Sequence, residues 1–393
     1  MLLTLAVENY RSLRRLVLPL GRLTVITGAN GTGKSSLYRA LRLLAESSRN
    51  GAVAALAREG GLPSTLWAGP DTIGRSVREG RHPVQGTVRA GSVRLCLGFA
   101  SDDLGYAIDL GLPQRSDSAF KLDPEIKREC VWSGPVLRPG ALLSDRRGPL
   151  ARTRDADGSW QIAHDTLRPY DSMLSEVVDP QQAPDLVALR ERIRGWRFYD
   201  HVRTDLEAPA RTAQIGTRTP VLGHDGADLA AALQTIVEIG DVAALEGAVA
   251  RALAGSRIEV TERAGRFELA LHQPGLLRPL GAAELSDGTL RYLLWVAALL
   301  TPRPPELLVL NEPETSLHPD LLQPLAELVA AASHRTQVIV VTHAAVLVRA
   351  IAARGHRDEL DLAAVELVKD EFGRTTVAGR DELDNPLWTW PTR

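Results

Sequence analysis

Several kinds of residue are scarce in this chain, and each scarcity narrows the classes of protein to which it can belong. Among its 393 residues only Cys96 and Cys130 are cysteines, which argues against a disulfide framework and against a structural zinc site. No run of eighteen apolar residues occurs, so we expect no membrane-spanning helix and no membrane partner. The first residues lack a basic stretch and a small-residue cleavage site. The sequence therefore predicts a cytoplasmic location.

Lysine is scarce as well, and the net charge is small. The formal net charge is −2, so the whole molecule does not attract nucleic acid, and any contact with DNA needs a local basic patch. Lysine occurs only at positions 34, 121, 127 and 369 among 46 basic residues. The retention of Lys34 in so arginine-rich a chain is suggestive, because the arginine fork does not fit a tight phosphate loop.

Residues 28–36, GANGTGKSS, directly follow the apolar run 23–26. Glycines let the backbone curl so that successive N–H groups point inward, a lysine supplies positive charge, and a hydroxyl next to it can ligate a hard cation. The spacing Gly28-x-x-x-x-Gly33-Lys34-Ser35 is that of a phosphate loop, placed between an expected strand and an expected helix. The segment therefore predicts a site for a nucleotide phosphate.

The pattern of apolar residues predicts an α/β fold with a split parallel sheet. We expect the core in two pieces, residues 1–112 and 257–393, with buried strands at 22–27, 306–310 and 337–341. Residues 113–256 are rich in proline and arginine and predict an inserted, mostly helical or irregular lobe, with helices at 184–196, 227–238 and 241–254. A hairpin is expected at 257–260 and 267–271.

Three further motifs carry chemistry. The apolar run 307–310 ends in Asn311-Glu312, as a central strand does when it delivers polar side chains to a ligand at its carboxyl end. Ser286 and Gly288 stand directly before an expected helix, where a hydroxyl and free N–H groups form an anion site. His343 follows the buried run 337–341. Taken singly, each has an ordinary explanation: an acidic turn, a helix-capping serine and a structural histidine.

In this order and spacing, the motifs resemble those of the ABC-type ATPases, and more narrowly the SMC/RecF-like branch and its compact predicted AAA-family ATPases. Residues 28–35 match Walker A, 307–312 Walker B and 285–288 the LSxG signature, while residues 316–318 and His343 take the places of the D-loop and the switch histidine. The stretches 196–205, WRFYDHVRTD, and 311–319, NEPETSLHP, carry the narrower likeness. The fold implied is a P-loop NTPase head.

The resemblance implies that two copies sandwich two ATP molecules head-to-tail, so that a homodimer forms with ATP and Mg²⁺. Glu312 would act as base or water-positioner and His343 would contact the γ-phosphate. The implied nucleotide contacts are Arg11, Asn30, Gly31, Gly33, Lys34, Ser35 and Ser36 in one copy, and Ser286 and Gly288 in the other. The implied Mg²⁺ site comprises Ser35, Asn311 and, in place of the glutamine loop, Gln114.

One departure from the family's pattern concerns the metal. The family's Walker B ends in Asp-Glu, whereas position 311 is Asn here. A neutral amide still offers an oxygen but lacks one negative charge beside a dication. We therefore expect weakened Mg²⁺ dependence and slow ATP hydrolysis.

The absent motifs exclude several relatives and leave two functions open. No Asn-Lys-x-Asp motif of a GTPase and no Cys-x-x-Cys of a zinc hook occurs, and, with some fifty residues after His343, we expect no fused nuclease domain. The first function is a DNA-repair ATPase (for example in double-strand break repair) that clamps duplex DNA. Its candidate phosphate contacts are Arg146, Arg147, Arg152, Arg154, Arg190, Arg192, Arg194 and Arg197. The alternative is a regulatory switch that gates a separate effector protein, as in phage defence.

Overall fold

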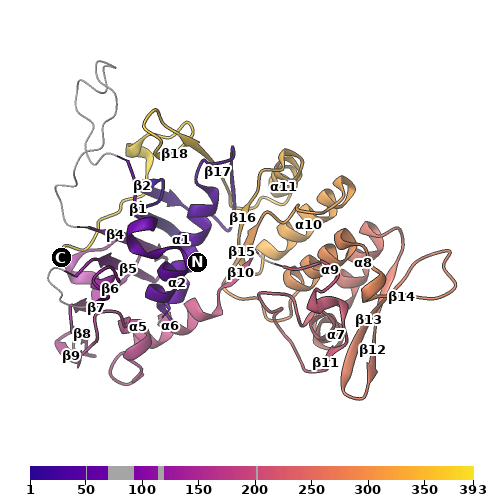
Figure 1. The fold of residues 1–393 in the computed structure, drawn as a ribbon, viewed down its shortest axis with the longest axis horizontal. Coiled ribbons are helices and arrows are strands. Elements are labelled where there is room, and N and C mark those ends of the chain that lie inside the picture. Colours follow the sequence, from indigo (N-terminus) through magenta and orange to yellow (C-terminus); the bar gives the residue numbers. More distant parts are fainter. Residues whose placement is uncertain (50, 70–92, 114–118, 201) are drawn as a thin grey trace. The chain divides into compact units, whose positions relative to one another are not determined.

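The computed structural model describes residues 1–49, 51–69, 93–113, 119–200 and 202–393 (Figure 1). The chain forms two compact units, and each is built from segments far apart in the sequence. Unit 1 comprises Met1–Leu20, Gly28–Arg194 and Val365–Arg393, and unit 2 comprises Gly21–Thr27 and Gly195–Ala364. The chain therefore passes from unit 2 into unit 1 between Thr27 and Gly28, at the start of the glycine-rich segment.

Unit 1 contains an antiparallel sheet with the strand order β2-β1-β4-β5-β6-β7-β8-β9 among the residues described. Its central strands are buried on both faces, as the burial of every residue of β4 and β5 shows. The strands are β1 (Leu2–Tyr10), β2 (Leu13–Pro19), β4 (Leu95–Ser101), β5 (Leu104–Gly111), β6 (Glu125–Ser133), β7 (Leu142–Arg147), β8 (Leu150–Arg154) and β9 (Trp160–His164).

The expectation of a mostly helical or irregular segment 113–256 is wrong for its first half. Four strands, β6 to β9, occupy residues 125–164 and extend the first sheet. The apolar alternation that would have revealed them is interrupted by buried ion pairs. Arg146 of β7 and Glu129 of β6 are both fully buried and lie 2.9 Å apart. Such a pair fills core positions with charged residues that sequence patterns assign to the surface.

Helices and the final residues complete unit 1. Trp388 packs edge-on against Trp132 of β6 with ring centroids 5.7 Å apart, and Arg393 pairs with the buried Asp109 of β5 at 2.8 Å. The aromatic tail therefore packs against the sheet. Cys130 lies in the same cluster, and burial raises the pKa of its thiol to about 12. The helices are α1 (Lys34–Ser47), α2 (Ala52–Arg58), α3 (Gly61–Thr65), α5 (Met173–Glu176) and α6 (Pro184–Gly195).

A sheet with parallel central strands forms the framework of unit 2. Strands β10 (Arg197–Tyr199), β15 (Leu307–Asn311), β16 (Gln337–Val341) and β3 (Leu23–Gly28) pair in that order, all parallel. The strand order continues with β17 (Leu362–Lys369) and the antiparallel β18 (Thr375–Val377), whose residues from Val365 onward belong to unit 1. The strands predicted at 22–27, 306–310 and 337–341 are confirmed, and their continuous apolar runs reflect burial on both faces.

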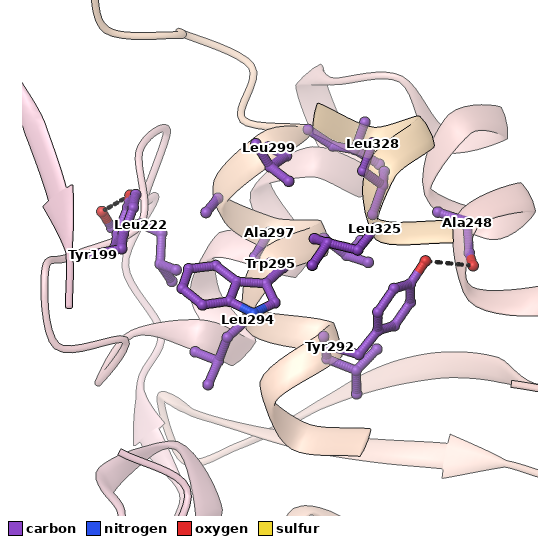
Figure 2. Close-up of a cluster of buried hydrophobic side chains, with 14 of the residues drawn as sticks. Tyr199, Leu222, Ala248, Tyr292, Leu294, Trp295, Ala297, Leu299, Leu325 and Leu328 are labelled. Carbon is purple, nitrogen blue, oxygen red and sulfur yellow. Dashed lines mark hydrogen bonds between the residues drawn. The ribbon is translucent and has the colours of Figure 1, made fainter. Parts of the chain in front are cut away.

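Around this sheet lie α7 (Leu229–Ile239), α8 (Val242–Ala252), α9 (Asp287–Leu299), α10 (Leu322–Ser333) and α11 (Ala345–Arg357). Helices α7 and α8 confirm the helices expected at 227–238 and 241–254, and α6 confirms the one at 184–196. Figure 2 shows α9 at the centre of the core: Trp295 packs edge-on against Tyr199 of β10, and the Tyr292 hydroxyl donates to the Ala248 carbonyl of α8. Helix α9 is thus held on several sides.

A small second sheet in unit 2 contains the predicted hairpin. Strands β12 (Arg257–Arg263) and β13 (Arg266–His272) pair in antiparallel register, and β11 (Gln214–Ile215) and β14 (Leu280–Gly281) add to β13. Along the chain, the 3₁₀ turn η2 (Pro209–Arg211) precedes β11 and the 3₁₀ turn η3 (Ala282–Glu284) follows β14, and the two turns contact each other. No helix in the described part of the chain is long and apolar enough to span a membrane.

Candidate functional site

The glycine-rich segment of unit 1 forms a tight loop that only glycine fits at two positions. Gly28 and Gly33 have φ values of 144° and 111°, which side-chain-bearing residues rarely adopt. A Cβ atom at Gly28 would overlap the Leu367 carbonyl oxygen, and one at Gly33 would lie 2.5 Å from the Thr375 hydroxyl. On one side the backbone of the loop therefore packs against β17 and β18 at Gly28 and Gly33. Ala29, Asn30 and Gly31 are exposed.

Lys34 and the start of α1 supply positive charge to this loop. The Lys34 ammonium group donates to the carbonyl oxygens of Gly28 at 2.6 Å and of Ala29 at 3.1 Å, so the side chain folds back along the loop. Helix α1 begins directly after Gly33, has no side-chain cap and has no acidic residue in its first turn. Its free N–H groups and helix dipole favour an anion there. Ser35 is exposed and Ser36 half-buried at this end.

Three polar side chains to which sequence reasoning assigned no role support the loop. The Thr375 hydroxyl donates to the Thr32 carbonyl at 2.6 Å and pairs with the Ser12 hydroxyl at 2.8 Å. Lys369 donates to the same Thr375 hydroxyl at 3.3 Å, and burial lowers the pKa of its ammonium group. Thr375 is separated from the loop by more than three hundred residues, so only the fold brings them together.

For two of the residues expected to bind the nucleotide or the metal, the structure describes no contact with the phosphate loop. Arg11, at the turn between β1 and β2, pairs with Glu59 at 2.7 Å, and Glu59 also accepts a hydrogen bond from the Tyr10 hydroxyl at 2.6 Å. Its guanidinium is thus engaged within unit 1 by a carboxylate. Gln114 lies outside the residues that the structure describes.

In unit 2 the carboxyl ends of the parallel strands are aligned, so the residues that follow β15 and β16 lie at the same edge of the sheet. Asn311 of β15 is in register with Val341 of β16, and Val341 is in register with Ile26 of β3. Polar residues follow each of these strand ends: Glu312 after β15 and Thr342-His343 after β16. The carboxyl edge of the sheet therefore collects the acidic turn and the histidine, as the sequence predicts.

Glu312 and His343 lie side by side at this edge. The His343 Nδ1 atom is 3.6 Å from a Glu312 carboxylate oxygen, and both side chains are about half exposed. Glu312 has φ of 49°, a left-handed conformation that is uncommon for a residue with a side chain, and its N–H donates to the Val341 carbonyl. Strained backbone of this kind tends to cluster at functional positions. The geometry gives Glu312 an exposed carboxylate with a fixed backbone.

Glu314 is a member of this cluster that sequence reasoning did not assign. Its carboxylate is buried, and one oxygen accepts from the Thr342 hydroxyl at 2.6 Å and from the His343 N–H at 3.1 Å. The same oxygen lies 3.3 Å from His343 Nδ1, and the second oxygen has no hydrogen-bond partner among the residues that the structure describes. Glu314 therefore fixes the backbone that carries His343. The only sequence signal was a second glutamate two residues after the first.

The signature segment starts α9 as predicted. Ser286 is the N-cap, and its hydroxyl accepts from the Thr289 N–H at 3.2 Å. A Cβ atom at Gly288 would lie 2.8 Å from the Ser316 carbonyl oxygen, so glycine permits the close approach of the segment 316–318. Ser316 itself has φ of 63°. The proposed signature and D-loop segments are thus in direct contact within unit 2.

The residues present fit a nucleotide phosphate. The loop is exposed from Ala29 to Gly31, between Gly28 and Gly33, the two glycines that pack against neighbouring strands. The loop also carries a lysine and leads into a helix with no side-chain cap, as a phosphate site requires. Mg²⁺ with a nucleotide commonly uses one or two protein oxygens and the phosphates themselves, so a full protein cage is not required. The described residues contain no group of three or more His, Cys, Asp or Glu side chains suited to holding a metal.

The arginines proposed as DNA contacts are largely engaged inside the fold. Arg146 has no exposed surface and also donates to the Asp171 and Arg168 carbonyls, so its assignment as a DNA contact is wrong. Arg152 and Arg147 pair with Asp145 at 3.4 Å, and Arg154 lies over the Trp160 ring. Arg192 pairs with Asp103 at 2.6 Å, and Arg190 and Arg194 pair with Glu191. Arg197 donates to the Gly195 and Trp196 carbonyls.

Parallel strands with a phosphate loop directly after β3 define a protein of the P-loop NTPase class. A comparison with protein families agrees with this class. Residues 23–349 match the AAA-domain family described as a putative AbiEii toxin of a type IV toxin–antitoxin system, and the chain belongs to that family. The recognition made from the motifs is thereby confirmed at the level of the family. No match was found among curated proteins.

Solved structures that are similar in outline include heads of SMC proteins. An SMC head bound to the C-terminal winged-helix domain of ScpA shares 13% identity over 96% of each chain, with a TM-score of 0.46. The SMC head domain from Thermotoga maritima shares 14% identity over 97% of this chain and 99% of its own, with a TM-score of 0.43. An SMC head with an extended coiled coil, bound to the C-terminal domain of ScpA derived from Pyrococcus furiosus, shares 12% identity over 96% and 95%, with a TM-score of 0.47.

Removal of the buried Glu314 carboxylate tests its anchoring role. We expect Glu314→Ala to lower the free energy of unfolding by about 1–3 kcal/mol, because the buried Thr342 hydroxyl and the His343 N–H lose their acceptor. Glu314→Gln keeps one acceptor oxygen and should cost less. Urea unfolding measures the stability, and hydrogen exchange of the His343 amide reports the loop. The exposed Glu371→Ala is the control; equal effects of Glu314→Ala and this control would contradict the assignment.

Proposed function

We propose that this protein binds and hydrolyses ATP and that two copies close head-to-tail around two ATP molecules. The observation that carries the proposal is the phosphate loop, in which Gly28 and Gly33 leave no room for a side chain and Lys34 lies along the backbone. Such a loop, followed by an uncapped helix, suits a triphosphate. The family to which the chain belongs is one of AAA ATPases.

Within one copy, the N–H groups of the loop from Asn30 to Gly33 and the start of α1 would bind the phosphates. Lys34 would leave its two carbonyl partners to reach the terminal phosphates, and Ser36 would donate to the α-phosphate side of the loop. Ser35 and Asn311 are the proposed Mg²⁺ ligands, with Gln114 and Arg11 kept as proposals from the sequence. Bound Mg²⁺ would neutralise phosphate charge.

The acidic turn would perform the proton chemistry. Glu312 has an exposed carboxylate that would accept a proton from, or orient, the attacking water, since a general base must stand within hydrogen-bond reach of the group it deprotonates. His343, 3.6 Å from Glu312, would hold the terminal phosphate. Glu314 would keep His343 in place through its backbone N–H. Hydrolysis would then release the closed pair, so the output is conformational.

For the output of this cycle, we propose that the closed pair gates a separate effector protein. Two observations favour this function over the clamping of DNA. The family description refers to a toxin–antitoxin system. In addition, Arg146 is buried and the other arginines proposed for DNA have partners within the chain. The DNA-repair alternative keeps its support from the exposed parts of Arg147 and Arg152. ATP-dependent capture of a partner in nuclease-treated samples supports the first, and ATP-dependent, salt-sensitive duplex binding supports the second.

Loss of the proposed base should trap the closed pair. We expect Glu312→Gln to slow ATP hydrolysis about 100-fold or more, because general-base catalysis contributes about that factor. The unhydrolysed ATP should then hold two copies together, and size-exclusion chromatography with ATP should show a dimer. Lys34→Ala in the same background should prevent this, because loss of a charged contact weakens ATP binding about 10- to 100-fold. A Glu312→Gln protein that stays monomeric at saturating ATP would refute the sandwich.

Restoration of the family's Walker B charge tests the metal assignment. We expect Asn311→Asp to raise the ATPase rate or to lower the Mg²⁺ concentration needed for half-maximal rate, because a carboxylate attracts a dication more strongly than an amide does. A Mg²⁺ titration of the steady-state rate measures both quantities. Gln181→Glu, at an exposed position outside the proposed site, adds the same charge and should change neither quantity. If Asn311→Asp leaves both quantities unchanged, Asn311 does not belong to the metal site.

A further inference from the structure

Arg211 in turn η2 is a buried cation whose bonds converge on the signature segment. Its side chain is only 4% exposed. Nη1 donates to the carbonyl oxygens of Ala282, Ala283 and Leu285 at 3.2, 3.3 and 2.6 Å. Nη2 donates to the Asp287 carboxylate at 2.6 Å. One guanidinium therefore binds the chain both immediately before and immediately after Ser286.

Another edge of the same guanidinium binds a second segment of the chain, at Thr204 and Asp205. Nε donates to the Thr204 and Asp205 carbonyls at 3.0 Å, and Nη2 also donates to the Thr204 carbonyl at 2.8 Å. Both residues lie in the stretch 196–205, which carries part of the resemblance and to which sequence reasoning assigned no role. Arg291 of α9 donates to the Val202 carbonyl at 3.0 Å, so this stretch is also attached to α9 itself.

Helix α9 in turn connects the signature to the acidic turn. The Trp295 indole N–H donates to the Pro313 carbonyl at 2.9 Å, directly after Glu312. Gly288, in the first turn of α9, lies against the Ser316 carbonyl. Arg211, the start of α9 and residues 312–316 thus belong to one continuous set of contacts inside unit 2.

This bond set is better suited to fixing a geometry than to stabilising a core. The transfer of a cation out of water is costly, and a well-packed apolar side chain of similar volume is often as stabilising as a buried ion pair. Arginine offers five N–H groups in a rigid planar fork, which can satisfy carbonyls on two segments at once. Asp287, its charged partner, is 57% exposed. The start of α9 is therefore exposed to solvent, while the buried Arg211 holds its backbone in place.

We propose that Arg211 is a positioning residue that holds Ser286 and the N–H groups at the start of α9 ready for a phosphate of the ATP bound by a second copy. The inference rests on the proposed head-to-tail pair. It adds the residue that positions the signature segment, which is the part of each ATP site contributed by the other copy. Since the signature acts on the other copy's ATP, loss of Arg211 should impair assembly and leave ATP binding by a single copy intact. Lysine cannot replace it, because one ammonium group cannot serve both segments.

The test uses Arg211→Lys in the full-length Glu312→Gln protein. We expect the ATP-dependent dimer to weaken at least tenfold in its dissociation constant, measured by analytical ultracentrifugation with ATP. The affinity for a fluorescent ATP analogue at low protein concentration, where the chain is monomeric, should change less than twofold. Arg218→Lys is the matched control, since Arg218 is exposed and pairs with Glu238 on the surface. It should leave both quantities unchanged.

A second set of variants guards against misfolding of the Arg211 variant. Asp287→Ala removes the exposed partner and should weaken the dimer, and Asp287→Glu should restore it, with no change in the urea midpoint. If Arg211→Lys and Asp287→Ala both dimerise as the Glu312→Gln parent does, the inference is overturned and the proposed function stands. If the parent itself never dimerises with ATP, both are overturned. If ATP binding by the monomer falls together with assembly, Arg211 is merely structural and the inference is again overturned.

Discussion

The parallel registration of β3, β16 and β15 is the constraint on which the rest of the structure depends. It sets Ile26, Val341 and Asn311 at one level, so that the residues after each strand emerge at the same edge. Hydrogen bonds continue this registration beyond the strands, since Glu312 donates to the Val341 carbonyl and Thr342 donates to the Ile26 carbonyl. A slip of one residue would shift the residues after a strand along the edge and break these hydrogen bonds. The chemistry at the edge therefore depends on the register of the strands.

Buried charged groups in this protein serve to fix backbone. Glu314 holds the loop of His343 through two hydrogen bonds, and Arg211 holds the start of α9 through carbonyls on two segments. Both are surrounded by partners that belong to different parts of unit 2. A hydrogen bond to an ionised group is stronger and more directional than one between neutral groups, which suits a site whose parts must keep their positions. In unit 1, Thr375 supports the phosphate loop with a neutral hydroxyl instead.

The sequence predicted what depends on local pattern. The buried strands at 307–311 and 337–341, the helices α7 and α8 and the hairpin at 257–271 follow from apolar runs, caps and turns, and the structure has all of them. It missed the four strands at 125–164, because Glu129 and Arg146 occupy core positions as an ion pair. It also missed Glu314, Arg211 and Thr375, whose partners are set by tertiary structure. No spacing along the chain reports a contact between Thr375 and Thr32.

The discontinuous build of unit 2 has a consequence for how the protein is made. Strand β3 leaves the ribosome early, yet its partner β16 is synthesised only after unit 1 has received most of its sheet. During that interval the apolar run Leu23–Ile26 has no parallel neighbour to bury it. Contacts that join distant parts of a chain form slowly and leave hydrophobic strands open to aggregation. Nascent chains halted before residue 337 are the ones that would most need a chaperone.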